Sequence, residues 1–278
     1  MPGHIDYLST AGFAKEAKIL ALKMVNKADA SHIGGCLSIA DVLAVLFHGI
    51  LKIDPSNPKE PDRDILIYSK AHSSAIYYAV LALKKFFPKD LLDDFCKDGS
   101  IFTAHLNHHV PGVEYSGGSL GHGLPVACGI ALAFKKQGKS NRVFCIVSDG
   151  ELQEGSNWEA ILFGAQHQLS NLILIIDFNK IQALGEVASI LNLENIESKF
   201  LSFGWDALRI DGHDHKAIIE AFEMPHSYTK PLVVVCDTIK GKGVSFMEYN
   251  IKYHYSSPRD QELIRAIEEI ENETDVYK

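Results

Sequence analysis

The sequence predicts an α/β fold, with an open, mostly parallel sheet and helices on both of its faces. Short apolar runs rich in β-branched residues alternate with segments in which apolar residues recur at helical spacing. These runs are too apolar to leave one face in water, which is typical of strands buried between two layers. With 278 residues, of which 46% are hydrophobic, the chain is long enough to bury such a core.

The elements of the first half follow in order from the N-terminus. Helical spacing predicts a helix over residues 9–27, and Ser38, after a turn, is expected to cap a second helix. A short apolar run predicts a strand over residues 63–68, followed by a helix over residues 69–83. Residues 96–123 contain many Gly and His without a clean period, so we expect an ordered loop there.

The second half continues the alternation of strand and helix. The expected strands cover residues 143–147, 172–176, 207–210 and 232–236. The expected helices cover residues 124–136, 156–168, 190–203 and 215–224. No repeat, low-complexity tract or linker divides the chain, so we expect one domain over residues 1–278 with a C-terminal helical tail at residues 258–278.

Composition excludes several classes of protein. The net charge of -8 argues against sequence-independent binding to nucleic acid or to an anionic membrane, so neither is expected as a partner. The five cysteines are scattered without a C-x-x-C pair, which favours a reducing cytoplasmic location over a disulfide framework. The first residues lack the features of a signal peptide, and we expect no run apolar enough to span a bilayer.

Polar residues follow two neighbouring strands at the point where each strand ends. Asp149 and Gly150 come after the strand at 143–147, and Asn179 stands 30 residues after Asp149. Ligands of open parallel sheets bind at this edge. A carboxylate, an amide oxygen and a backbone carbonyl suit Mg²⁺ or Ca²⁺ together with a diphosphate. Gly150 allows backbone N–H groups to approach a phosphate near the start of the next helix.

Other interpretations of these residues and of two further segments remain open. Asp149 and Gly150 form a turn in one of them, with Asp149 capping the next helix. The histidines in residues 105–109 suggest a transition-metal cluster, but no further spaced His or Cys pair completes it. The K-G-K-G run at residues 240–243 lacks the spacing of a Walker phosphate loop, so we expect a flexible loop after a strand.

Several motifs, in order, resemble those of the transketolase family. The D-G-E-L-Q-E-G run at residues 149–155, the interval to Asn179 and the following Ile181 resemble the family's thiamine-diphosphate fingerprint. The resemblance covers about residues 9–257 and implies a thiamine-diphosphate-binding fold of the diphosphate-binding type. Four further blocks agree: A-S-H-I-G at 30–34, D-R-D at 62–64 with S-K-A-H at 69–72, P-G-V-E at 111–114 with G-S-L-G at 118–121, and K-G-K-G-V-S-F-M-E at 240–248.

The resemblance implies a role for each matching residue. Asp149, Asn179 and the carbonyl of Ile181 would ligate the Mg²⁺ that holds the cofactor diphosphate, with Ca²⁺ or Mn²⁺ as substitutes. Glu154 would lie at the subunit contact that connects the two active sites. We also count it among the implied cofactor-binding residues. The other implied cofactor contacts are His72, Gly118, Ser119, Leu120, Gly150 and His254. The implied catalytic residues are His32, His72, His105 and His254. Ketol transfer needs groups that exchange protons with sugar hydroxyls, and we expect histidines that titrate near neutrality to do so.

Four positions depart from the family pattern near the implied cofactor. Ala71, Ser148 and Tyr255 stand where the family usually has Gly, and His122 stands where it usually has Gln. Added side chains at positions of close approach are expected to reshape the pocket and alter the accepted sugar. The metal ligands are unchanged.

The length leaves no room for the family's second domain, which grips the aminopyrimidine. The resemblance therefore implies the N-terminal subunit of a split thiamine-diphosphate-dependent transketolase, active only with a separate C-terminal subunit, with two copies of each in a heterotetramer. It would transfer a two-carbon ketol unit between ketose and aldose sugars or sugar phosphates. One alternative is a related ketol or acyloin transferase or synthase of specialised sugar or natural-product metabolism. Another is a non-enzymatic binding module, against which the intact Asp149, Asn179, His32 and His72 count.

Overall fold

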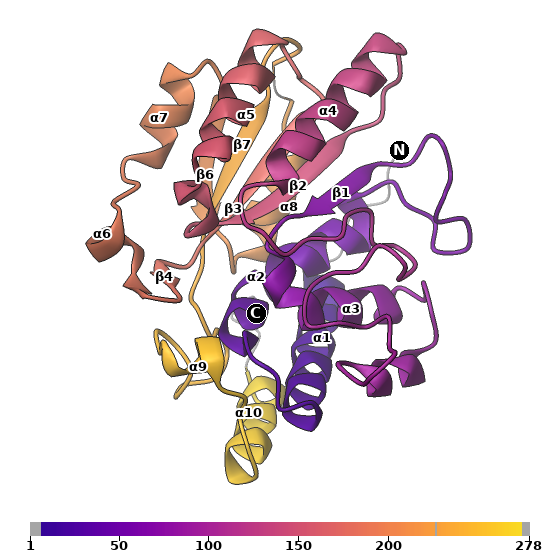
Figure 1. The fold of residues 1–278 in the computed structure, drawn as a ribbon, viewed down its shortest axis with the longest axis vertical. Helices are drawn as coiled ribbons and strands as arrows, with labels where there is room; N and C mark the ends of the chain where they lie inside the picture. The colour runs from indigo at the N-terminus through magenta and orange to yellow at the C-terminus, as the bar shows by residue number, and fades with distance from the viewer. Residues whose placement is uncertain (1–6, 226, 274–278) are drawn as a thin grey trace.

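The computed structural model describes residues 7–225 and 227–273, and Figure 1 shows a central sheet with helices on either side. The sheet has five parallel strands in the order β1-β2-β3-β7-β6. Their bounds are Ile65–Tyr68 (β1), Val143–Ser148 (β2), Leu172–Phe178 (β3), Leu232–Asp237 (β7) and Asp206–Asp211 (β6). The predicted fold class is confirmed. The expectations for residues 1–6 and 274–278, at the ends of the predicted domain and tail, lie outside the described residues.

Side chains alternate along each inner strand between two helical layers, which is the period-2 geometry of a strand. Ile175 and Val234 pack into one core, while Leu174 and Val235 pack into the other. The first layer contains α1 (Tyr7–Lys27), α2 (Ile33–Val45), α3 (Ser74–Leu83), α8 (His215–Glu223) and α10 (Gln261–Glu271). The second layer contains α4 (Gly123–Lys136), α5 (Gly155–Gln166) and α7 (Ile196–Ser202).

Shorter elements connect these layers. They are a π-helical turn η1 (Leu46–Ile50), the 3₁₀ turns η2 (Ala71–Ser73), η3 (Lys89–Asp94) and η4 (Glu151–Gln153), and the helical turns α6 (Val187–Ile190) and α9 (Lys252–Tyr255). An antiparallel hairpin that the periodicity did not predict joins β4 (Ile181–Gln182) to β5 (Gly185–Glu186). The helix expected over residues 190–203 is instead divided between α6 and α7. In Figure 1, α9 and α10 lie at the bottom of the molecule, drawn in yellow.

The start of α2 differs from the expectation. The helix begins at Ile33, and His32 at its N-cap has a left-handed φ of 72°. Ser38 lies inside the helix rather than at its cap, so that part of the prediction is wrong. The Ser38 hydroxyl instead donates to the buried Asp177 carboxylate at 2.6 Å. The tertiary partner decides this placement, because a buried carboxylate needs hydrogen-bond donors.

One helical segment is long and apolar enough to cross a membrane by length and composition alone, contrary to the expectation from the sequence. It covers Ile33–Ile50, and 89% of that window is buried inside the domain. A helix that is covered by neighbours on all sides needs apolar residues all round, as a membrane span does. Contacts of α2 with α1, α3 and α8 account for the composition.

The carboxyl ends of the parallel strands meet at one edge of the sheet. Lys70 follows β1, Asp149 follows β2, Asn179 follows β3 and Lys240 follows β7. In register, Ser148 lies opposite Asp177, and Phe178 lies opposite Asp237. Charged and polar side chains from segments far apart in the sequence are therefore gathered at this edge.

Candidate active site

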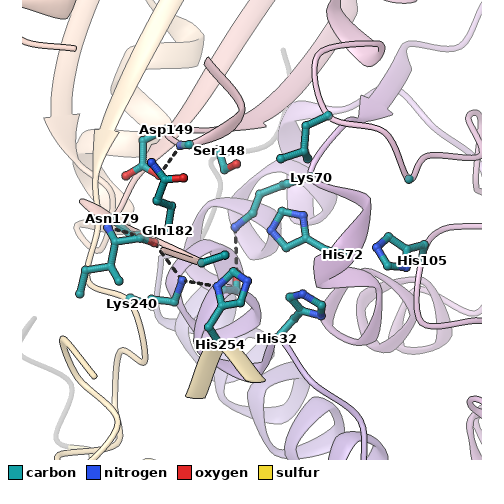
Figure 2. Close-up of a pocket in the computed structure, with 16 residues that line it drawn as sticks. His32, Lys70, His72, His105, Ser148, Asp149, Asn179, Gln182, Lys240 and His254 are labelled. Atoms are coloured by element: carbon teal, nitrogen blue, oxygen red, sulfur yellow. Dashed lines mark hydrogen bonds between the residues drawn. The ribbon is translucent and has the colours of Figure 1, made fainter. Parts of the chain in front are cut away.

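A cavity of about 210 Å³ opens at the carboxyl edge of the sheet (Figure 2). It is lined by every residue that the sequence analysis proposed, except Ser119 and Glu154. The lining residues from that set are His32, His72, His105, Gly118, Leu120, Asp149, Gly150, Asn179, Ile181 and His254. Ser119 and Glu154 are both exposed outside the cavity.

The three predicted metal ligands present oxygen atoms on one side of this cavity. The Asp149 side chain is 1% exposed, and its Oδ1 and Oδ2 accept hydrogen bonds from the backbone N–H groups of Gly150 and Lys180, at 2.7 and 2.5 Å. Asn179 Oδ1 accepts from the Ile181 N–H at 3.2 Å. Asp149 does not cap α5, because neither η4 nor α5 has a side-chain cap. The interpretation of Asp149 as a simple helix cap is therefore wrong.

The electrostatics of Asp149 fit a bound cation. Burial and the nearby Asp177 carboxylate raise the pKa of Asp149 to about 6. Two backbone N–H groups and Lys240 oppose this rise, but they do not supply enough positive charge to cancel it. A buried carboxylate with an excess of negative charge around it gains stability from a cation. Carboxylate, amide and carbonyl oxygens are the donors that Mg²⁺ and Ca²⁺ prefer, so the residues present fit the implied metal.

Lys240 lies between the oxygen donors and the histidines (Figure 2), a place that was not predicted from the sequence. Its side chain is 3% exposed, and its Nζ donates to the Ile181 carbonyl at 2.9 Å and lies 3.0 Å from Nδ1 of His254. Burial and the nearby Lys70 lower the pKa of Lys240 to about 8, so the ammonium form still prevails at neutral pH. The expectation of a flexible loop at residues 240–243 is wrong for Lys240, because its stem packs against Gly34 and its head is held in the cavity.

A buried ion pair at the wall of the cavity, which Lys70 lines, was also not predicted from the sequence. The Lys70 ammonium bonds to Asp177 and donates to the Gly35 carbonyl at 2.9 Å. Both side chains of the pair are almost fully buried, with exposures of 1% and 0%. Burial alone would raise the pKa of Asp177, but Lys70, Ser38 and other donors hold it below its usual range. A lysine two residues after a buried strand was the available signal, since such a charge needs a partner.

Glu151 is a third buried group outside the predicted set. Its carboxylate accepts from the Gly121 N–H at 3.0 Å and from the hydroxyl of Ser69. These bonds tie the loop that contains Gly118 and Leu120 to the end of β1. A Cβ placed on Gly118 would meet no atom of the described residues within 4 Å, so the cavity is open at this point.

The histidines from four segments of the chain meet on the other side of the cavity (Figure 2). The ring centroid of His32 lies 5.2 Å from that of His72, 6.0 Å from that of His105 and 4.9 Å from that of His254. His32 occupies the N-cap of α2, and its backbone N–H donates to the His254 carbonyl at 2.9 Å. A left-handed conformation at a non-glycine residue in such a site is a conformational strain that the surrounding contacts maintain.

The protonation of these histidines differs from the expectation of titration near neutrality. Burial first, and then His105 and the Lys240 and Lys70 ammonium groups, lower the pKa of His32 to about 4. Burial and Lys240 lower the pKa of His254 to about 3. The pKa of His72 is also well below its usual value, chiefly through burial. These three imidazoles are therefore neutral at physiological pH in the chain as it stands.

Stability is expected to fall as the solution is acidified. The pKa of His32 is about 4 in the folded chain against 6.5 for the unperturbed side chain, so the unfolded chain binds more protons between these values. The contribution of His32 is fully present above about pH 6.5 and is lost as the pH falls towards about 4. Urea unfolding at about pH 7 and about pH 5 measures this loss.

The matched variant for this measurement is His32→Gln, which cannot titrate. Asp149, whose raised pKa acts in the opposite direction over about pH 4–6, is unchanged in both proteins, so the comparison isolates His32. The variant is expected to lose less stability than the native chain on acidification. Equal losses would show that His32 is not held neutral.

The four departures from the family pattern have different surroundings. The Ala71 methyl packs so close to Gly117 that a Cβ there would lie 2.5 Å away. The hydroxyl of Ser148, which lines the cavity, accepts from the Glu151 N–H at 3.2 Å. Tyr255 is 61% exposed, its ring lies 4.8 Å from that of His254, and its hydroxyl donates to the Ala183 carbonyl at 3.0 Å. His122 is exposed at the start of α4 and does not line the cavity.

The alternative transition-metal site at residues 105–109 has no supporting geometry. Among residues 7–225 and 227–273, no group of three or more His, Cys, Asp or Glu side chains has the arrangement of a metal site. His108 Nδ1 instead lies 2.6 Å from the Ser116 hydroxyl, and His105 faces His32 in the cavity.

Together these features define a class of protein. A parallel α/β domain presents hard oxygen donors beside buried ammonium groups at the carboxyl edge of its sheet, and neutral imidazoles face them across a cavity. This arrangement suits an enzyme domain that binds the diphosphate of a cofactor and exchanges protons with a substrate next to it.

Comparison with known proteins identifies the family. Residues 9–271 match the transketolase, thiamine diphosphate binding domain, and the chain belongs to this family. It is thus part of a thiamine-diphosphate-dependent transferase. It is 38% identical over 271 residues to an apulose-4-phosphate transketolase subunit from Actinobacillus succinogenes, covering 96% of this chain and 98% of that protein. It is 39% identical over 256 residues to the 6-deoxy-6-sulfo-D-fructose transketolase subunit SqwG of a Clostridium species, covering 91% of this chain and 93% of that protein.

Solved structures agree with the family assignment. The crystal structure of transketolase from Campylobacter jejuni superposes with a TM-score of 0.87 at 33% identity, covering 95% of this chain and 42% of that chain. Transketolase from Leishmania mexicana superposes with a TM-score of 0.88 at 26% identity, covering 96% of this chain and 42% of that chain. The chain thus spans less than half the length of these transketolases, but nearly the whole length of the two subunits named above.

Proposed function

We propose that this chain is the N-terminal, diphosphate-binding subunit of a split transketolase. With a separate C-terminal subunit it transfers a two-carbon ketol unit from a ketose to an aldose, on sugars or sugar phosphates. The main support is the match over 98% and 93% of the length of two proteins that are themselves named as transketolase subunits. The cavity is consistent with this proposal, because its open side leaves room for groups from another chain.

The metal and the cofactor diphosphate are assigned to the oxygen donors and buried cations of the cavity. Asp149, Asn179 and the Ile181 carbonyl would ligate Mg²⁺, with Ca²⁺ or Mn²⁺ as substitutes, because all three residues line the cavity and carboxylate, amide and carbonyl oxygens suit such an ion. Lys240 lies beside the Ile181 carbonyl and would add positive charge next to the diphosphate. When bound, thiamine diphosphate supplies the nucleophilic carbon and the electron sink for cleavage of the carbon–carbon bond.

The chain's own part in the chemistry is to orient the sugar and move its protons. The Lys240 ammonium donates to Nδ1 of His254, so in the neutral ring Nε2 bears the proton and is a hydrogen-bond donor. His32, His72 and His105 lie within one ring cluster with His254 and would face the sugar hydroxyls. Neutral imidazoles both accept and donate protons, which ketol transfer requires.

The assembly proposed is a heterotetramer with two copies of each subunit, located in the cytoplasm. Glu154 and Ser119 are exposed outside the cavity, where a partner chain could contact them. Glu154 remains our candidate for the contact between paired sites, and Ser119 our candidate for a cofactor contact in the complete enzyme.

Reconstitution tests the proposal. The chain and a separate C-terminal transketolase subunit are expected to transfer ketol units only when both are present with thiamine diphosphate and Mg²⁺. The donors assayed are xylulose 5-phosphate, apulose 4-phosphate and 6-deoxy-6-sulfofructose, with ribose 5-phosphate and glyceraldehyde 3-phosphate as acceptors. Chelation of the metal is expected to abolish turnover, and added Mg²⁺, Ca²⁺ or Mn²⁺ to restore it.

Two outcomes would contradict the proposal. One is turnover by the isolated chain at the rate of the mixture, which would remove the need for a second subunit. The other is a mixture that binds the cofactor yet transfers no ketol unit from any of these donors, which would leave the chain without transketolase activity on them.

A further inference from the structure

Besides the local turn bonds that the Lys242 and Val244 N–H groups donate to the Ile239 and Gly241 carbonyls, three hydrogen bonds hold the backbone on either side of Lys240. The Lys240 carbonyl accepts from the Tyr249 N–H at 3.0 Å, and the Gly241 N–H donates to the Gly34 carbonyl at 2.9 Å. The third bond runs from the Ile239 N–H to Nε2 of His213, at 2.9 Å. Of the three, only this bond uses a side chain, so only it can be altered by substitution without changing the backbone.

The contacts of His213 define its tautomer. The Ile239 N–H can only donate, so Nε2 of His213 must be an unprotonated acceptor. In the neutral ring the proton then lies on Nδ1, which is 2.7 Å from Oδ2 of Asp41 and donates to it. The Asp41 carboxylate therefore determines which ring nitrogen faces Ile239.

Asp41 is well suited to this because it stays ionised. It lies on α2, its carboxylate is 3.0 Å from the Lys18 ammonium of α1, and His215 Nε2 is 3.5 Å away. Burial alone would raise its pKa, but Lys18 and the hydrogen bonds from His213 and His215 hold that pKa well below the usual range. We refer to Lys18, Asp41, His213 and His215 as the Asp41 cluster.

The fold brings His213 to the loop after β7 through Gly212. The Gly212 N–H donates to the Asp237 carbonyl at 2.8 Å. A Cβ on Gly212 would lie 2.5 Å from Cγ2 of Thr238, so the two segments approach each other more closely than any side chain there would allow. His213 thus stands next to the segment that leads to Lys240.

We propose that His213 is a positioning residue for Lys240: the Asp41 carboxylate sets its tautomer, and its Nε2 holds the Ile239 backbone so that the Lys240 ammonium meets the cavity. The ammonium is thereby placed at the Ile181 carbonyl and at Nδ1 of His254. The inference rests on the proposed function only in that the cavity receives the cofactor diphosphate. His213 itself does not line the cavity.

Two substitutions at His213 distinguish the effect of the hydrogen bond to Ile239 from the effect of having any polar side chain at this position. In His213→Asn the amide ends near the position of Nδ1 and cannot reach Ile239, whereas in His213→Gln the amide oxygen reaches the position of Nε2. Calorimetry of thiamine diphosphate and Mg²⁺ binding is carried out on the complex of both subunits. We expect about tenfold weaker binding for His213→Asn and binding within about twofold of the native complex for His213→Gln.

The matched control is His215→Asn. His215 shares Asp41 with His213, but its Nδ1 lies 2.7 Å from the Thr10 hydroxyl of α1 rather than facing the loop after β7. This variant is expected to lower the thermal midpoint of unfolding while leaving cofactor affinity within about twofold. Should His213→Asn not fold, His213→Leu, which has no acceptor, takes its place.

A double-mutant cycle with Lys240→Met decides whether His213 acts through Lys240. On that background, His213→Asn is expected to weaken cofactor binding by less than about twofold. A loss of the same size as in the native background would overturn the proposal. So would native affinity in His213→Asn, or an equal loss in His215→Asn. Failure of the native complex to bind thiamine diphosphate would instead count against the proposed function.

Discussion

Replacing Asp149 by alanine is expected to abolish the metal-dependent binding of thiamine diphosphate, and with it all turnover. Asp149 is buried at the end of β2 and lines the cavity, and burial and the nearby Asp177 carboxylate raise its pKa, so a bound cation would stabilise its ionised form. Loss of a residue that hydrogen-bonds to a metal ligand typically lowers metal affinity about 10- to 100-fold. Loss of a direct ligand should therefore lower it at least about 100-fold. Calorimetry with Mg²⁺ and cofactor on the complex of both subunits measures the change.

The matched control is Asp62→Ala. The Asp62 side chain is 68% exposed, 3.7 Å from Lys139, and lies outside the cavity. This variant removes one carboxylate from the same protein and is expected to bind the cofactor as the native complex does. Asp149→Ala with native affinity would refute the assignment of Asp149 as a metal ligand.

Breaking the buried pair of Lys70 and Asp177 is expected to have the largest effect on stability. Both side chains are almost completely buried, so removing one leaves the other charge without its partner in a low-dielectric interior. Lys70→Met is expected to lower the free energy of unfolding by about 3–5 kcal/mol. Urea unfolding, followed by circular dichroism, measures this change.

An exposed ion pair in the same chain provides the comparison. Lys27 and Asp93 are 2.8 Å apart, but their side chains are 55% and 70% exposed. Lys27→Met is expected to cost less than about 1 kcal/mol, because water already solvates both charges. Similar costs for the two lysine substitutions would mean that the buried pair contributes no more than a surface pair does.

Local patterning accounts for the parts of the fold that were predicted correctly. The strands β2, β3 and β7 are continuous apolar runs, and their neighbours show helical spacing, so element types follow from periodicity. Asp149 and Asn179 were predicted to meet because the ends of parallel strands share one edge. Both side chains line the cavity.

The errors arise where a distant partner decides. Ser38 has the residue type of a helix cap, but it lies inside α2 because its hydroxyl bonds to Asp177, 139 residues away in sequence. Lys240 lies in a run of glycines and lysines that suggests a mobile surface loop. Its side chain is nevertheless buried, because Ile181 and His254 accept its hydrogen bonds and Gly34 leaves space for its stem.

The histidines were likewise predicted correctly only in part. Their residue type and the blocks around them were sufficient to propose that they face a substrate. Their charge state was predicted incorrectly, because pKa depends on burial and on nearby cations rather than on residue type. Lys70 and Lys240 approach the rings only after the sheet has formed, and they favour the neutral form of His32 and His254.

The amino-acid sequence alone determined the parallel sheet, the order of its elements and the oxygen donors at its carboxyl edge, because these depend on periodicities and spacings within short stretches of chain. Only the tertiary structure decided which ammonium meets which carbonyl, which imidazoles are neutral and how His213 reaches the loop before Lys240. These contacts join residues from separate strands and helices. Their energies depend on burial, and no segment is buried before the layers pack together.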